Sequence, residues 1–336
     1  MTGWSKETGY AVEFGTSYDA PMRGGVGVVD ALIGMLKHCD QAIELERDEL
    51  LVMTSVGVKH YLYEELYNPA YEPARYFSAK GELFSNYGVF ESFEQHTNYE
   101  IREFNFLSAG DLAKLLAYEL GDNRAVLSWG VGDRDEVVWI TGVSATPTTF
   151  EVTIRRGNGE ESVIDLRQRG GKLQGEDDED FVNWCVVARP KGGEVAWALS
   201  AEKRFELMLK WAYKHGMGRK EFFHETRENY ATGLAAYETL VGSVSARLDE
   251  LDGEQRDRFQ MQVQGHLDEL AEGRGAMGRH LASYGDDYAE IASAYQNIAE
   301  GLSALSFENS DVFAQEVERL AAQEREVLKL VSKVLS

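Results

Sequence analysis

Residues 136–156 read EVVWITGVSATPTTFEVTIRR and contain two runs rich in Val, Ile, Thr and aromatic residues, separated by a short polar stretch. Such runs, with alternation at a period of two, are typical of β-strands. The next three residues, GNG at 157–159, form a hairpin signal before a further strand-like run at 161–167. Strands joined by such short turns pair antiparallel. This stretch therefore predicts the centre of an antiparallel sheet.

Helical patterns precede this sheet. Residues 26–39 and 111–120 have apolar residues at helical spacing, and Gly121 follows the second run as a C-cap signal. Two more strand-like runs, AVLSWG and FVNWCVVA, occupy 125–130 and 181–188. Helices followed by an antiparallel sheet indicate the α+β class.

The sequence pattern changes after RPKGG at 189–193. Beyond this point apolar residues recur at intervals of three and four, which predicts amphipathic helices packed as antiparallel neighbours. We therefore predict an α+β domain at 1–190 and an all-α helical bundle at 191–336. Glu324 interrupts the last stripe, which suggests either exposure or a polar contact there. The stripes are Leu234, Tyr237, Val241, Val244, Leu248 and Leu251; Tyr284, Tyr288, Ile291, Tyr295, Ile298, Leu302 and Leu305; and Phe313, Val317, Leu320, Val327, Val331 and Val334.

The composition excludes several classes of partner. A formal net charge of −23 repels nucleic acid and anionic membranes.

No apolar run is long enough to cross a bilayer, and the first residues lack the apolar core of a signal peptide, so we expect a cytoplasmic protein. The spacings of zinc ligands are missing, and we expect no metal and no cofactor. The glycine-rich stretch GGVGVV at 24–29 lacks the Lys-Ser/Thr of a phosphate loop and the last glycine of a dinucleotide fingerprint.

Several segments together resemble papain-like proteins of the butirosin biosynthesis protein H N-terminal type. They include GVGVVDALIGMLKHCDQAIEL at 25–45, DEVVWITGVSATPTTFEVTI at 135–154 and DFVNWCVVARP at 180–190. The resemblance implies a papain-like fold in which a long helix carries a catalytic Cys and a strand carries a catalytic His. It covers most of the chain as a pattern, and the helical C-terminal region matches the domain that often follows in this family.

The chain departs from this family at both reactive positions. The pattern places the family's Cys at or near Gly27 and its His at Glu136. Glycine has no side chain to activate, and a carboxylate does not take over the proton of a thiolate as imidazole does. Cys39 would lie at the C-terminal end of the helix, where the dipole disfavours a thiolate, and Cys185 lies in an apolar strand. The departures imply a protein that has lost the covalent route of its relatives.

Two groups of residues remain as candidate ligand contacts. The first group is Arg134, Asp135 and Glu136, which stand at the head of a strand, together with Trp139 on that strand. In a papain-like fold the three residues at its head face the former cleft. The second group is an aromatic, partly acidic stretch that would hold a cationic or sugar-like molecule, or would pack between domains. Its candidate contacts are Tyr61, Tyr63, Tyr67 and Arg75.

Three hypotheses about function stay open at this stage. The first is a non-catalytic binding or scaffold protein that recognises a small molecule or a protein partner in the remnant cleft. The second is an active enzyme of the acyl-transfer or hydrolase class in which Glu136, with Asp135, acts as the acid or base. The third is an interaction protein whose helices pair with another chain. The sequence does not fix the oligomeric state.

Overall fold

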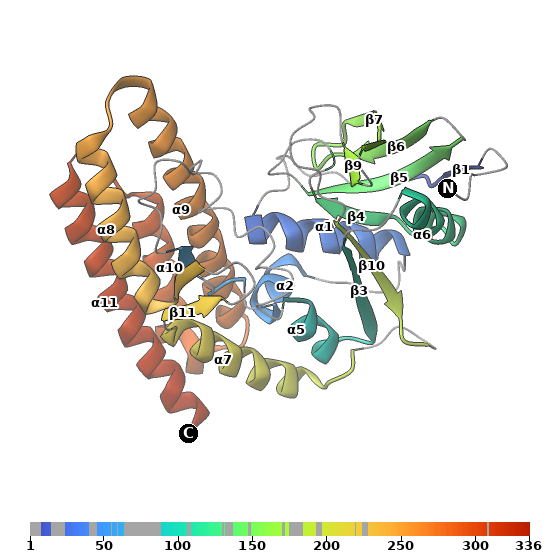
Figure 1. The fold of residues 1–336 in the computed structure, drawn as a ribbon. Coiled ribbons are helices and arrows are strands. Elements are labelled where there is room, and N and C mark those ends of the chain that lie inside the picture. Colours follow the sequence, from blue (N-terminus) through green and yellow to red (C-terminus); the bar gives the residue numbers. More distant parts are fainter. Residues whose placement is uncertain are drawn as a thin grey trace. The chain divides into compact units, whose positions relative to one another are not determined.

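The structure is a computed structural model that divides into two units by its internal contacts. Residues 1–45 with 97–198 form the sheet unit, and residues 46–96 with 199–336 form the helical unit (Figure 1). The described residues are 8–14, 24–39, 46–54, 56–58, 60–63, 89–105, 109–129, 131, 137–146, 149–169, 172–174, 184–192, 197–218, 220–223, 228–307 and 309–336.

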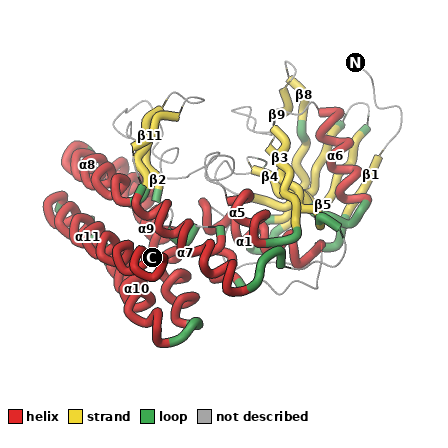
Figure 2. The backbone as a smooth tube through the Cα atoms, turned by 90° about the horizontal axis from the view of Figure 1, so that it is seen from below, coloured by secondary structure: helices red, strands yellow, loops and turns green. Residues whose placement is uncertain are grey.

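An antiparallel sheet, whose strands are yellow in Figure 2, forms the centre of the sheet unit. Its strand order is β3-β10-β4-β5-β6-β7, and β1 also pairs with β5. The hairpin predicted at GNG is present, because the Arg156 amide donates to the Glu160 carbonyl at 2.9 Å between β6 and β7. The predicted α+β class with an antiparallel sheet is confirmed. The elements are β1 Thr8–Ala11, α1 Gly24–Cys39, β3 Tyr99–Asn105, α6 Ala109–Gly121, β4 Val126–Trp129, β5 Val137–Ala145, β6 Phe150–Arg155, β7 Glu161–Asp165, β8 Arg167–Arg169, β9 Lys172–Gln174 and β10 Trp184–Pro190.

Strand β5 is buried along most of its length because helices cover both of its faces. Val138 and Ile140 share a hydrophobic cluster with Leu116 of α6. Side chains alternate between the faces of a strand, so Trp139 points to the opposite face. There its indole nitrogen Nε1 donates to the Ala31 carbonyl of α1 at 2.9 Å. Helix α1 is thereby fixed to the strand.

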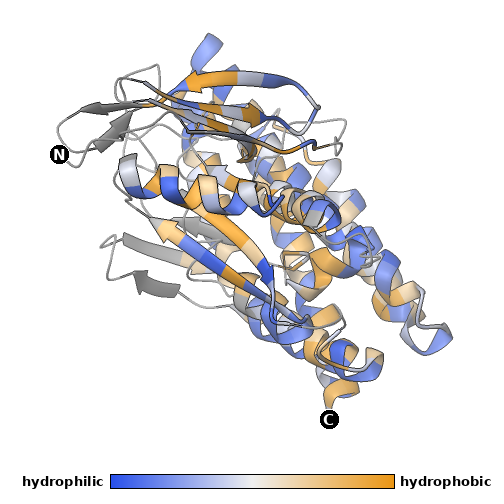
Figure 3. Cartoon of the chain, turned by 90° about the vertical axis from the view of Figure 1, so that its right-hand side faces the viewer, coloured by the Kyte–Doolittle hydropathy of each residue, from blue (hydrophilic) through white to orange (hydrophobic). Residues whose placement is uncertain are grey.

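Long helices build the helical unit, in which α9 packs with α10 and α11 packs with α8 and α7. A small antiparallel sheet, β11-β12-β2, packs against α8. The prediction of an all-α bundle at 191–336 is therefore wrong in this detail, because β11 and β12 lie in that range. In Figure 3 hydrophobic and hydrophilic residues alternate along the helices, as expected for amphipathic helices. The elements are α2 Arg47–Met53, β2 Tyr61–Tyr63, α5 Val89–His96, α7 Ala201–Met217, β11 Lys220–Phe223, β12 Glu228–Thr232, α8 Leu234–Glu250, α9 Gly253–Ala282, the 3₁₀ turn Asp286–Tyr288, α10 Ala289–Ser303 and α11 Ser310–Leu335.

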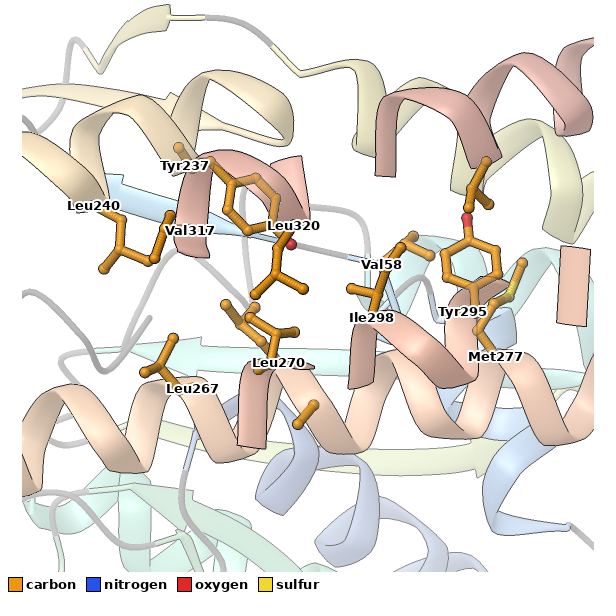
Figure 4. Close-up of a cluster of buried hydrophobic side chains, with 14 of the residues drawn as sticks. Val58, Tyr237, Leu240, Leu267, Leu270, Met277, Tyr295, Ile298, Val317 and Leu320 are labelled. Carbon is orange, nitrogen blue, oxygen red and sulfur yellow. The ribbon is translucent and has the colours of Figure 1, made fainter. Parts of the chain in front are cut away.

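Most of the predicted apolar stripes are buried in one hydrophobic core. Tyr237, Tyr295 and Val317 are among its members (Figure 4). The prediction for Tyr284 is wrong, because this residue was expected in the core and is 37% exposed. It lies in the turn before α10, where the helical spacing does not apply.

The helical unit also contains a segment from the first half of the chain. The predicted boundary at residue 190 had assigned this segment to the other domain. Helix α2 packs along α9. Val58 belongs to the helical core, near Ile298 (Figure 4). A Cβ placed on Gly273 would lie 3.0 Å from the Gly57 Cα, so two glycines permit this close approach of backbones. Residues 46–96 therefore belong with the helices rather than with the sheet.

Candidate functional site

The first candidate site is the contact between the N-terminal half of α1 and β5. Gly27, the position matched to the nucleophile of the papain-like family, is a buried residue in the first turn of α1. Ala31 follows one helical turn later and accepts the hydrogen bond of Trp139. The Trp139 side chain is 0% exposed and its ring centroid lies 4.6 Å from that of Phe14. The indole is thus packed against α1 and Phe14, and its hydrogen bond ends one helical turn from Gly27.

The other predicted contacts are distributed over the chain. Tyr61 and Tyr63 lie in β2 of the helical unit, where Tyr63 pairs with Tyr230 of β12. They belong to a different unit from Trp139. Arg134, Asp135, Glu136, Tyr67 and Arg75 lie outside the described residues. Of the predicted residues that the structure describes, Gly27 and Trp139 share the sheet unit, where they lie on the packed elements α1 and β5.

The two cysteines differ in how much the structure describes. Cys39 is the last residue of α1, as predicted, and its side chain is not described. Cys185 is fully buried in β10, and its Sγ lies 3.9 Å from the Ser128 Oγ. Burial raises the pKa of the Cys185 thiol to about 12, because the apolar surroundings disfavour a thiolate. This thiol is therefore unsuited to nucleophilic attack at neutral pH.

A buried ion cluster fixes the C-terminal end of α6, and the sequence did not reveal it. The Glu119 side chain is 0% exposed and accepts from Arg124 Nε at 2.7 Å and from Arg189 Nη2. Both guanidinium groups also lie over the ring of Tyr118. Because the cluster joins α6 to the start of β4 and the end of β10, it explains how a carboxylate is tolerated inside the sheet unit.

A second buried ion pair lies at the centre of the helical unit. Arg274 of α9 donates through Nη2 to Glu324 Oε1 of α11 at 2.7 Å, and both side chains are at most 1% exposed. The Tyr237 hydroxyl donates to the other carboxylate oxygen of Glu324 at 2.5 Å. Glu324 therefore makes the polar contact that its place in an apolar stripe suggested, and it is not exposed. We call Arg274, Glu324, Tyr237, Tyr295, His60 and His266 the polar centre.

Burial controls the protonation of the polar centre. Burial and the neighbouring Glu324 carboxylate raise the pKa of Tyr237 well above its usual value, so its hydroxyl stays protonated. Burial disfavours the Arg274 charge, but Glu324 outweighs that effect and the pKa of Arg274 is raised. Burial lowers the pKa of His60 well below its usual value, and His266 and Arg274 add to this. At neutral pH His60 is therefore an uncharged ring.

His60 is the member of the polar centre that comes from the first half of the chain. Its ring contacts Tyr237 edge-on with centroids 4.5 Å apart, and it lies 5.3 Å from the ring of His266. Within the described ranges, no group of three or more His, Cys, Asp or Glu residues is arranged to hold a metal ion. The one sequence signal for this centre was Glu324 in an apolar stripe.

Comparison with known proteins identified no similar sequence. The chain matches no protein-family model, and no curated protein shows significant sequence similarity to it. A separate observation concerns membranes: among the helices of the described residues, none combines the length and the apolar character needed to span a bilayer.

A groove between α10 and α11 is a further feature of the helical unit. Its volume is about 470 Å³, within the range of ligand-binding clefts. Small and apolar side chains mix with charged ones along it. The lining residues are Glu290, Ala294, Asn297, Arg319, Ala322, Gln323, Glu326, Val327 and Leu330.

Proposed function

We propose that this chain is a non-catalytic binding or scaffold protein that recognises a small molecule or a partner protein. Its sheet unit would be a papain-like domain that has kept the helix-on-strand arrangement of acyl-transferring and peptide-cleaving relatives. By the same resemblance, the Cys and His that perform the covalent chemistry in that family would correspond to a position at or near Gly27 and to Glu136.

One observation carries this proposal. In the arrangement implied by the resemblance, a nucleophile on α1 must face open space shared with a base on the neighbouring strand. Here Trp139 of that strand is fully buried, and its indole hydrogen bond ends on Ala31, one turn from Gly27. Such a contact supports packing at this place rather than covalent chemistry. The raised pKa of the buried Cys185 supports the same interpretation.

The test combines a search for turnover with a search for binding. Wild-type protein is incubated with aminoacyl thioesters and short peptides, and products and acyl-protein adducts are measured by mass spectrometry. We expect neither product nor adduct. In a thermal-shift screen of aminoacylated and polyamine-like compounds, we expect at least one compound to raise the melting temperature without being consumed.

The control variant is Glu160→Gln, which changes an exposed carboxylate in the turn between β6 and β7. Turnover by the wild type and by Glu160→Gln, with loss in Glu136→Gln, would establish the alternative of an enzyme that uses Glu136. A screen in which no compound is bound would count against the small-molecule form of the proposal.

A second candidate function is favoured by the groove between α10 and α11. Its lining contains Ala294 and Ala322, and small side chains allow a partner helix to approach closely. The helical unit would then act as an interaction module, and the simplest partner is a second copy of the chain.

Sedimentation at increasing protein concentration tests this second function. We expect a rise in mass for the wild type, and we expect Ala294→Glu to reduce it because a charge would be buried in the contact. Ser293→Glu, at an exposed position of α10 outside the groove lining, is the control and should associate like the wild type. A monomer at every concentration would exclude self-association through the groove.

A further inference from the structure

Part of the first half of the chain is inserted into the helical unit. We call its described residues, Thr54, 56–58 and His60 with the strand β2, the insert segment. Thr54, 56–58 and His60 are all buried, and the His60 carbonyl accepts from the Gly233 amide at 2.9 Å. Strand β2 continues from this point and pairs with β12. The insert segment is therefore fixed by backbone hydrogen bonds and by the burial of its side chains.

The polar centre surrounds the end of the insert segment. Among the described residues, the other titratable or charged groups of the polar centre are Tyr237 of α8, His266 and Arg274 of α9, Tyr295 of α10 and Glu324 of α11. His60 contacts Tyr237 and His266 directly, and it experiences the charge of Arg274. In the described part of the chain, neither ring nitrogen of His60 has a hydrogen-bond partner. The imidazole is therefore packed as an apolar ring.

The surroundings of His60 cannot stabilise the positive charge of a protonated ring. Both oxygens of Glu324 are already engaged, one by Arg274 and one by Tyr237. An imidazolium at His60 would be a second buried positive charge beside Arg274 without a carboxylate of its own. Such a charge is tolerated only after the ring reaches water, which requires the insert segment to leave the core.

We propose that the insert segment is an acid-sensitive latch, in which protonation of His60 under mild acid releases the segment, together with β2, from the helical unit. The inference does not depend on the proposed function. It adds a regulated step to the molecule, because Tyr61 and Tyr63 of β2 directly follow His60 and would move with the latch.

The direction and size of the effect follow from proton linkage. A released His60 titrates near its ordinary pKa of about 6.5, whereas burial holds the pKa of the latched ring well below that value. The latch is fully stable above about pH 6.5 and loses stability as the pH falls below it, because the released state binds more protons. One such histidine raises the equilibrium constant for release by about 30-fold between pH 8 and pH 5.

Hydrogen exchange of the full-length protein tests the latch. Protection factors, corrected for the intrinsic exchange rate at each pH, are compared at pH 8, 6.5 and 5. We expect β2 and its partner β12 to lose about 30-fold of their protection at pH 5, while β5 and β6 of the sheet unit keep theirs. In His60→Gln, which carries no titrating ring, the pH dependence in β2 and β12 should disappear.

Two further variants keep the test decisive. His60→Phe retains an aromatic ring against Tyr237 and replaces His60→Gln if the glutamine variant does not fold. His280→Gln changes a half-buried histidine of α9 and should keep the wild-type pH dependence. The proposal is overturned if both units lose protection equally, if β2 keeps its protection at pH 5, or if neither His60 variant alters the pH dependence.

Discussion

Replacing Arg274 with methionine is expected to lower the free energy of unfolding by about 3–5 kcal/mol. The guanidinium is fully buried and donates to Glu324 at 2.7 Å. Methionine fills a similar path through the core but leaves the carboxylate with the Tyr237 hydroxyl as its remaining partner in the polar centre. An uncompensated buried charge is strongly destabilising. Urea unfolding followed by circular dichroism measures the change.

Two variants control this prediction. Arg258→Met removes a guanidinium from the same helix where it is 75% exposed and 3.5 Å from Glu254, and it should leave stability nearly unchanged. The double variant Arg274→Met with Glu324→Leu removes both charges and should recover most of the loss. If Arg274→Met were no more destabilising than Arg258→Met, the ion pair would not be the buried contact described here.

The periodic parts of the fold could be predicted from the sequence because each depends on local patterns. The runs in 136–156 predicted β5 and β6, and the apolar stripes beyond residue 193 predicted the long helices. The alternation of a strand and the spacing of three and four residues in a helix both indicate which side of the element is buried. Each pattern repeats this information every few residues. Tyr284 was misassigned because the stripe was extended into a turn.

The polar centre could not be predicted, because its pairs are far apart in the sequence. Arg274 lies in GRGAMGRH, whose glycines and arginines give no signal of a buried position, and its partner Glu324 is 50 residues away. His60 has no neighbouring signal for burial among helices that begin after residue 200. Placing 46–96 with the helices likewise depends on long-range packing, such as that of Gly57 on Gly273.

The contact between α1 and β5 shows how far the sequence leads in the sheet unit. Matching 25–45 and 135–154 to papain-like patterns led us to expect a helix next to the strand of Trp139, and α1 does pack on β5. The pattern did not predict what fills that contact. Trp139 was considered a ligand contact, but whether an indole faces a cleft or the core depends on which helix covers its side of the strand.

Replacing Trp139 with alanine is expected to lower the free energy of unfolding by about 3–5 kcal/mol. The indole is completely buried between β5 and α1, next to the ring of Phe14. Its removal leaves a large cavity and frees the Ala31 carbonyl from its side-chain donor. Thermal and urea unfolding measure the loss, and we expect the sheet unit to be the part that is destabilised.

Trp139→Phe separates packing from ligand recognition. Phenylalanine keeps most of the ring but cannot donate to Ala31, so we expect a loss of about 1–2 kcal/mol, less than for alanine. If Trp139 serves packing alone, any ligand found in the thermal-shift screen should bind Trp139→Phe as tightly as it binds the wild type. A variant that unfolds like the wild type but binds the ligand at least tenfold more weakly would instead make the indole a ligand contact. That outcome would require α1 to move away from β5 on binding, because the buried ring has no free surface in the present structure.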